Sequence, residues 1–245
     1  KAERCEIPTL LFYGVFGYAM VQLGYFIGIS RGVPLSLVLI IEFTAPIWIV
    51  LWIKFVRKSV VAKDMWVAIA LSLLGLILVA KAWQGFVFDL LGTLGALGAA
   101  LALAVYFLMS QSQGTKRSAQ AMVVWGMGVA GLFWSLVLPI WNFPTAIFTT
   151  EINLQGRFSD YSAPGWLLIA YIIVFGTLVP YLFVVGGIRR LSASTSSVIG
   201  MLEPVLAGAF AWIWLSQSWS AIQLFGGAIV LIGIYIADRA KSNAK

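Results

Sequence analysis

The chain has 245 residues, of which 61% are hydrophobic and only 10% are charged, and its mean hydropathy is +0.97. This excludes a soluble globular domain, because such domains are about 45–50% apolar and about 25% charged. With no histidine and one cysteine, Cys5, the sequence offers no disulfide, no cysteine–histidine metal site and no histidine-based triad. We therefore expect a membrane protein without a metal or an organic cofactor.

Eight stretches are long and apolar enough to cross a hydrocarbon layer of ~30 Å. They are predicted to be helices, because backbone groups in lipid must be satisfied internally and the alternating pattern of barrel strands is absent. In chain order they are residues 9–30, 34–53, 65–82, 88–110, 119–141, 164–188, 193–215 and 219–237. The long connection between the fifth and sixth, residues 142–163, is expected to form an external surface loop or a cover.

The basic residues indicate how these helices are oriented. If the spans alternate in direction, Arg31, Lys81 and Arg157 fall on one side of the membrane, and the other 13 of the 16 basic residues fall on the opposite side. Positively charged connections remain in the cytoplasm. The sequence thus predicts a multi-pass protein of the cytoplasmic membrane with both termini inside the cell. The net charge of +7 has the same origin, so we expect the lipid bilayer and not nucleic acid as a partner.

A shift of 158 residues superimposes landmarks of the first three spans on those of the last three. The pairs are Gly28 and Gly186, Arg31 and Arg189, Ser36 and Ser194, Pro46 and Pro204, Ala70 and Ala228, and Gly75 and Gly233. Arg31 and Arg189 are predicted to lie on opposite sides of the membrane, so the two units are inverted, as in many secondary transporters. We divide the chain into a three-helix unit, residues 1–82, and a five-helix unit, residues 83–245. Two helices are expected before Lys1, which would make the eight spans part of a ten-helix protein.

Several segments then resemble the drug/metabolite transporter superfamily, in its EamA-type branch. They are residues 41–46 (IEFTAP) with 47–51, 92–107 (GTLGALGAALALAVYF), 177–181 (TLVPY), 197–211 (SVIGMLEPVLAGAFA) and 224–236. The IEFTAP segment is similar to the bacterial threonine/homoserine exporter group. The resemblance implies an all-α polytopic bundle of two inverted five-helix repeats around a central cavity. It also implies export of small metabolites by alternating access, and it says almost nothing about the substrate.

Two acidic residues are predicted deep in the membrane, where an ionised group costs about 2.5–3.5 kcal/mol and usually faces a cavity or a partner. Glu203 lies about ten residues into its span, or ~15 Å, and Glu42 lies about eight residues into its own. Pro46 and Pro204 lack the N–H groups that would bond the carbonyls of Glu42 and Gly200, so both helices are expected to kink. Each helix then offers a carboxylate and a free carbonyl to an ammonium group or a proton. The alternative is that the acids are protonated or paired and that the prolines serve packing alone.

Polar side chains mark two further helix faces. Tyr18, Gln22 and Tyr25 share one face of the first span and are predicted either to line the cavity or to form interhelical hydrogen bonds. Thr177 and Tyr181, with Pro180 between them, are the corresponding candidates in the sixth span, and Tyr106 and Ser110 form a weaker pair in the fourth. Residues 194–197 (STSS) are expected to cap a helix, and the alternative is that they form hydrogen bonds to the substrate. Gly17, Gly24 and Gly28, and likewise residues 92–102, are predicted to be packing faces of small residues.

These observations favour a transporter, and more narrowly an exporter of amino acids or similar small polar metabolites. A proton-coupled step through Glu203 or Glu42 is a hypothesis, motivated by two acids at depth with no basic residue in the same stretches. A membrane-embedded enzyme is an alternative, but the sequence lacks the nucleophile, metal cluster or acid–base set that it would need. We therefore expect no enzymatic activity. A scaffold or receptor that transports nothing remains the other alternative, and it would show dry packing around both acids. The sequence does not indicate an oligomeric state.

Overall fold

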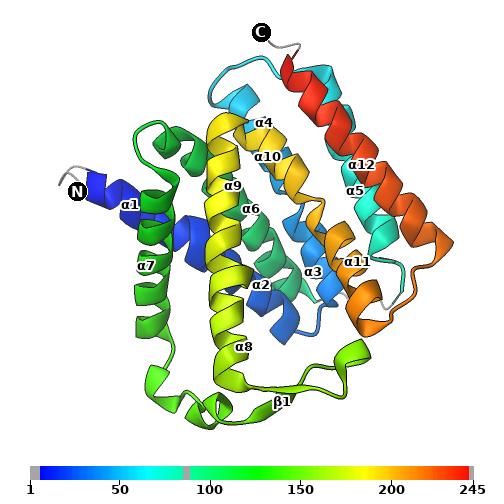
Figure 1. The fold of residues 1–245 in the computed structure, drawn as a ribbon. Helices are drawn as coiled ribbons and strands as arrows, with labels where there is room; N and C mark the ends of the chain where they lie inside the picture. Colours follow the sequence, from blue (N-terminus) through cyan, green and yellow to red (C-terminus); the bar gives the residue numbers. More distant parts are fainter. Residues whose placement is uncertain (1–5, 85–88, 243–245) are drawn as a thin grey trace.

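The computed structural model describes residues 6–84 and 89–242 of the chain (Figure 1). Within this part, seven helices of 18 or more residues are apolar enough to cross a membrane. The remaining predicted span is α5, which has 17 residues and lies at the lower end of the spanning range of ~17–25. The structure is thus a mostly helical membrane bundle, which confirms the predicted fold class. Lys1, Arg4, Cys5 and the expected start of the fourth span at Phe88 lie outside the described residues.

Four spans are continuous helices. They are α5 (Lys63–Val79), α6 (Leu90–Gly114), α7 (Ala119–Val137) and α12 (Ala221–Ser242). Asp89 and Ser118 cap the starts of α6 and α7, where their side chains accept hydrogen bonds from the N–H groups of Gly92 and Ala121. The predicted end of the fifth span at Trp141 was wrong. Leu138 is already extended because it precedes Pro139, and α7 therefore stops at Val137.

The other four spans are interrupted. Their parts are α1 (Ile7–Gly14), η2 (Val15–Ala19) and α2 (Met20–Ser30); α3 (Leu35–Glu42) and α4 (Ala45–Phe55); α8 (Gly165–Tyr171), η6 (Ile172–Leu178) and α9 (Val179–Arg190); and α10 (Ala193–Gly200) and α11 (Glu203–Leu215). The segments η2 and η6 are π-helical, and the other two interruptions are turns next to a proline.

Small residues set the closest helix contacts. A side chain at Gly24 would meet the backbone of α6 at Gly95 and Ala99, which confirms that both predicted faces serve packing. The pair α5 and α12 is equally close, because Gly75 and Gly226 each lie against the carbonyl of the other. Gly98 has no neighbour within 4 Å of its added Cβ, so the predicted face on α6 is narrower than the run of small residues suggested.

Helix α6 is the central element, and its contacts show the direction in which the neighbouring spans run. Along α1–α2, Tyr13 contacts Ser110 and Gly28 contacts Gly92, so this span runs antiparallel to α6. Along α9, Tyr181 lies beside Tyr106, and the Arg189 side chain packs on Gly114, so this span runs parallel to α6 (Figure 1). The Arg189 Nε donates to the Gly114 carbonyl over 2.7 Å and thereby caps the end of α6.

The long connection forms a strap at one end of the bundle. It contains η3 (Ile140–Asn142), η4 (Thr145–Phe148), the antiparallel strands β1 (Glu151–Asn153) and β2 (Ser162–Pro164), and η5 (Gly156–Phe158). It docks on the end of α11, where the Trp214 Nε1 donates to the Leu154 carbonyl over 2.8 Å and the Phe158 ring lies 4.8 Å from that of Trp214. The strap therefore joins the ends of α8 and α11 (Figure 1).

Candidate functional site

The two acid-bearing spans are both broken next to their carboxylates. Helix α3 ends at Glu42, and α4 starts at Ala45 with Pro46 in its first turn. The Thr44 hydroxyl closes the turn between them by donating to the Ile41 carbonyl over 2.6 Å. This break forms because a proline has no N–H to continue the hydrogen-bond ladder and clashes with the preceding turn.

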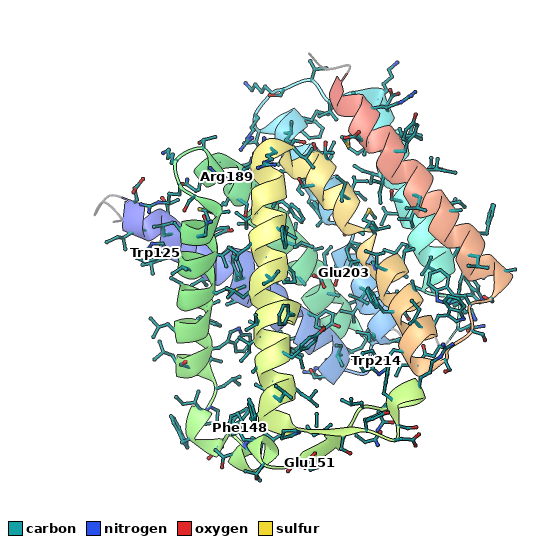
Figure 2. The ribbon with its side chains drawn as sticks, in the orientation of Figure 1. Trp125, Phe148, Glu151, Arg189, Glu203 and Trp214 are labelled. Carbon is teal, nitrogen blue, oxygen red and sulfur yellow. The ribbon has the colours of Figure 1, made fainter. Side chains whose placement is uncertain are left out.

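The second break is also a two-residue turn before a proline, but its acid follows the turn and does not precede it. Helix α10 ends at Gly200, and α11 starts at Glu203, which is followed by Pro204. The N–H groups of Met201 and Leu202 bond to the carbonyls three residues before them, over 3.1 and 3.0 Å. Glu203 thus stands at the first residue of the half-helix α11 (Figure 2). Glu42, in contrast, stands at the last residue of the half-helix α3.

The tertiary structure brings the two breaks into electrostatic range of each other. Glu42 interacts with Glu203, and both carboxylates interact with Tyr25 and Tyr181. Glu42 is partly buried, whereas Glu203 is exposed. Within the described residues, no hydrogen-bond donor or basic side chain contacts either carboxylate, and the ion pair that is present joins Glu6 to Arg117 elsewhere in the molecule. Acids at this depth in a membrane protein usually face a cavity or a partner, so this pair is the candidate site.

A cluster of four tyrosines lies beside these acids. The Tyr18 ring stacks on that of Tyr181 at 5.0 Å and contacts those of Tyr13 and Tyr106 edge-to-face at 5.3 and 5.2 Å. The Tyr13 hydroxyl bonds to that of Ser110 over 2.8 Å. Tyr13, Tyr18, Tyr106 and Ser110 are all at most 6% exposed. The predicted candidates Tyr18, Tyr181, Tyr106 and Ser110 therefore meet in one closed cluster.

The sequence did not indicate Tyr13 as a candidate. It lies five residues before Tyr18, and in a regular α-helix residues five apart lie on different faces. The π-helix η2 changes that periodicity, since its hydrogen bonds join residues five apart and bring such residues above one another. No sequence signal of this π-helix was recognised. The cluster is completed by Gly126 of α7, where a side chain would collide with the Tyr18 ring.

The remaining candidates are placed separately. Gln22 is exposed, and Tyr25 is partly buried next to the Phe26 ring, 5.7 Å away. The Thr177 hydroxyl donates to the Ile172 carbonyl over 3.1 Å inside η6, and Pro180 stands in the first turn of α9, directly after this π-helix. The cap of α10 is Ser192, two residues before the predicted group of hydroxyls.

Interrupted membrane-length helices are common in secondary transporters. The model of the EamA-like transporter family matches residues 90–237, and the chain belongs to this family. It is a membrane transport protein by class.

Individual relatives agree with this assignment. The chain is 29% identical to the threonine/homoserine exporter RhtA of Escherichia coli (strain K12), over 100% of this chain and 76% of the relative. It is 25% identical to the uncharacterized transporter YdfC of Bacillus subtilis (strain 168), over 94% of this chain and 70% of the relative. A crystal structure superimposes with a TM-score of 0.73 and 16% identity, covering 96% of this chain and 77% of that one, and this likeness shows the fold alone.

Proposed function

We propose that this protein exports small polar metabolites or amino acids across the cytoplasmic membrane by alternating access. The observation that carries the proposal is the pair of unpaired carboxylates, Glu42 and Glu203, that lie within electrostatic range of each other at two helix breaks. Each break also leaves a backbone carbonyl without the N–H that a proline lacks, at Glu42 and at Gly200. Carboxylates and carbonyls together bind an ammonium group or a proton.

The direction of the neighbouring spans supports the inverted repeat that alternating access uses. Arg31 lies against Gly92 at the start of α6, and Arg189 lies against Gly114 at its end. The intervening turns of α6 separate the two arginines by ~33 Å at 1.5 Å per residue, about the thickness of a membrane. In this proposal the end of the bundle with Arg189 and the C-terminal part of α12 faces the cytoplasm, in keeping with the excess of basic residues there.

Export of amino acids is proposed from the relative that is named a threonine/homoserine exporter. A substrate of this kind carries an ammonium group, which suits the two acids, and Tyr25 and Tyr181 lie within electrostatic range of both carboxylates. Coupling to protons is part of the proposal, because an acid that releases a substrate ammonium can take up a proton in its place.

The test is transport in proteoliposomes of the purified protein, with threonine and homoserine as substrates and an imposed pH gradient. Glu203→Gln should lower the gradient-driven initial rate by about tenfold or more, because the variant cannot exchange a proton. Glu151→Gln, an exposed acid of the strap, is the matched control and should transport like wild type.

Two results would overturn parts of this proposal. Undiminished transport by Glu203→Gln, with no dependence on the pH gradient, would replace proton coupling by facilitated exchange. Absence of transport of any amino acid or amine by the wild-type protein, together with acids that never react with a water-soluble carbodiimide, would favour the scaffold alternative.

A further inference from the structure

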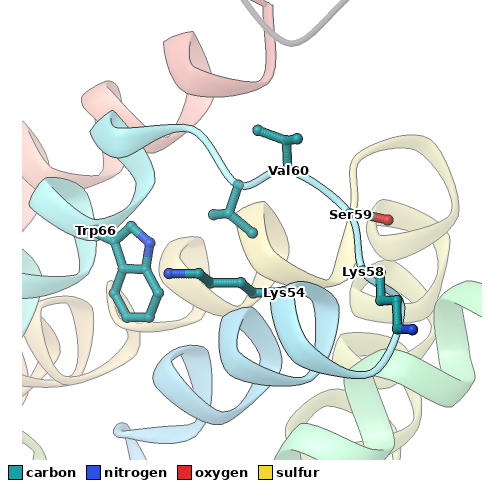
Figure 3. Close-up of a pocket in the computed structure, with 6 residues that line it drawn as sticks. Lys54, Lys58, Ser59, Val60 and Trp66 are labelled. Carbon is teal, nitrogen blue, oxygen red and sulfur yellow. The ribbon is translucent and has the colours of Figure 1, made fainter.

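A hollow of about 360 Å³ lies in the connection between α4 and α5 (Figure 3). Its walls are formed by Lys54, Lys58, Ser59, Val60, Val61 and Trp66. Figure 3 shows the Lys54 side chain extended toward the indole of Trp66, with the Val60 and Ser59 backbone passing above them. None of these residues belongs to the site around Glu42 and Glu203, so a role for this hollow does not depend on the proposed function.

The hollow is strongly positive. Lys54, Arg57, Lys58 and Lys63 lie in or beside the connection, and Asp64 at the start of α5 is the nearby acid in the sequence. Within the part of the chain that the structure describes, none of these four basic side chains forms an ion pair with a carboxylate. The Lys54 ammonium instead lies 5.5 Å above the ring of Phe55. Lys54 and Lys58 line the hollow, and two unpaired cations on one hollow attract an anion.

The same connection is apolar on its outside. Val60 is 97% exposed, Phe55 66% and Val56 56%. Exposed aliphatic and aromatic side chains next to lysines, with a tryptophan beside them, are typical of a segment that lies in the headgroup layer of a membrane. The anions of that layer include the phosphates of lipid headgroups.

A second hollow of about 190 Å³ adjoins the first and shares Val60 and Val61 with it. Its lining is mainly apolar, with Val50, Ile53, Met65 and Ala240 on its walls. Ser192, Ser194 and Thr195, at the start of α10, close it on the remaining side. A charged hollow that continues into an apolar one matches the two parts of a phospholipid.

We propose that the two hollows bind one anionic phospholipid, with its phosphate in the hollow that Lys54, Lys58 and Trp66 line and the beginning of an acyl chain against Val61 and Met65. Basic pockets between transmembrane helices bind anionic headgroups in this way. The bound lipid joins the α4–α5 connection to the first turn of α10. It therefore contacts the start of the span that carries Glu203.

The experiment measures lipid binding by the purified protein in nanodiscs of phosphatidylcholine with increasing amounts of phosphatidylglycerol, with native mass spectrometry as the readout. Wild type should retain phosphatidylglycerol in preference to phosphatidylcholine. The double variant Lys54→Gln/Lys58→Gln should lose this preference by about tenfold to thirtyfold, because each lysine near an anionic lipid strengthens the attraction by about fivefold. Lys54→Arg/Lys58→Arg should retain it.

Lys116→Gln is the matched control, because Lys116 is exposed at the same end of the bundle outside the two hollows, and it should bind like wild type. Equal preference in wild type and in Lys54→Gln/Lys58→Gln would overturn the proposal. Wild-type protein that binds phosphatidylcholine as tightly as phosphatidylglycerol would also overturn it, without any variant that has to fold. Complete displacement of the lipid by inorganic phosphate at equal concentration would assign the hollow to a soluble anion instead.

Discussion

The two proline-associated breaks resemble each other in sequence and differ in their surroundings. At the first, Ala45 and Pro46 are buried in the bundle, and Ile49 of the same half-helix is fully buried. At the second, no residue of α11 is buried. A similar local interruption is therefore followed once by a half-helix that packs in the core and once by a half-helix without a buried residue.

The acids also occupy different places relative to the breaks. Under the 158-residue shift, Glu203 corresponds to Ala45 and Glu42 corresponds to Gly200. Glu203 stands at the N-terminal end of α11, where the helix dipole favours a negative charge, and Glu42 stands at the C-terminal end of α3. Both units thus contain a helix break. The carboxylate precedes the break in the first unit and follows it in the second. In the structure Glu203 is exposed, whereas Glu42 is partly buried.

The largest expected difference concerns access from water. In a background with Cys5→Ser, the variant Glu203→Cys should react with a membrane-impermeant thiol reagent at least about tenfold faster than Glu42→Cys, because thiol reactivity follows exposure. Labelling rates in intact proteoliposomes provide the measurement. Equal rates would mean that the two acids share one environment.

A smaller difference is expected in stability. Ile49→Ala removes a fully buried side chain and should lower the free energy of unfolding by about 2–4 kcal/mol. Leu206→Ala, at a side chain that is 49% exposed on α11, should change it by less than about 0.5 kcal/mol. Reversible unfolding in mixed micelles gives both values. A cost at Leu206 as large as that at Ile49 would show that α11 is covered in the membrane.

The smallest expected effect is a difference in stability between substitutions in the two turns that interrupt the acid-bearing helices. Thr44 donates to the Ile41 carbonyl and accepts from the Trp48 Nε1 over 3.3 Å, and Thr44→Val should cost about 1 kcal/mol. Its counterpart Leu202 makes no such side-chain bond, so Leu202→Val should cost only about 0.4 kcal/mol for part of one methylene. The same unfolding assay applies. A reversed order would indicate that the hydroxyl does not stabilise the first turn.

Much of the fold follows from local chemistry that a sequence displays directly. Long apolar stretches must be helices in lipid, prolines 46 and 204 must interrupt theirs, and small residues such as Gly24 and Gly75 allow close helix approach. These rules depend on a residue and its neighbours along the chain, and they predicted the fold class, most span boundaries within a few residues and two of the packing faces. The family resemblance likewise rests on short segments of consecutive residues.

The tertiary structure decided what depends on residues far apart in the chain. The π-helix η2 turns Tyr13 into the cluster with Tyr18 and Ser110, and packing around α6 leaves Glu42 partly buried while Glu203 is exposed. Two further features also depend on residues far apart in the chain. One is the docking of the strap on Trp214, and the other is the pair of adjoining hollows between Lys54 and the start of α10. Exposure and contact are sums over neighbours from many segments, and for that reason the sequence alone identified the acids but not their different surroundings.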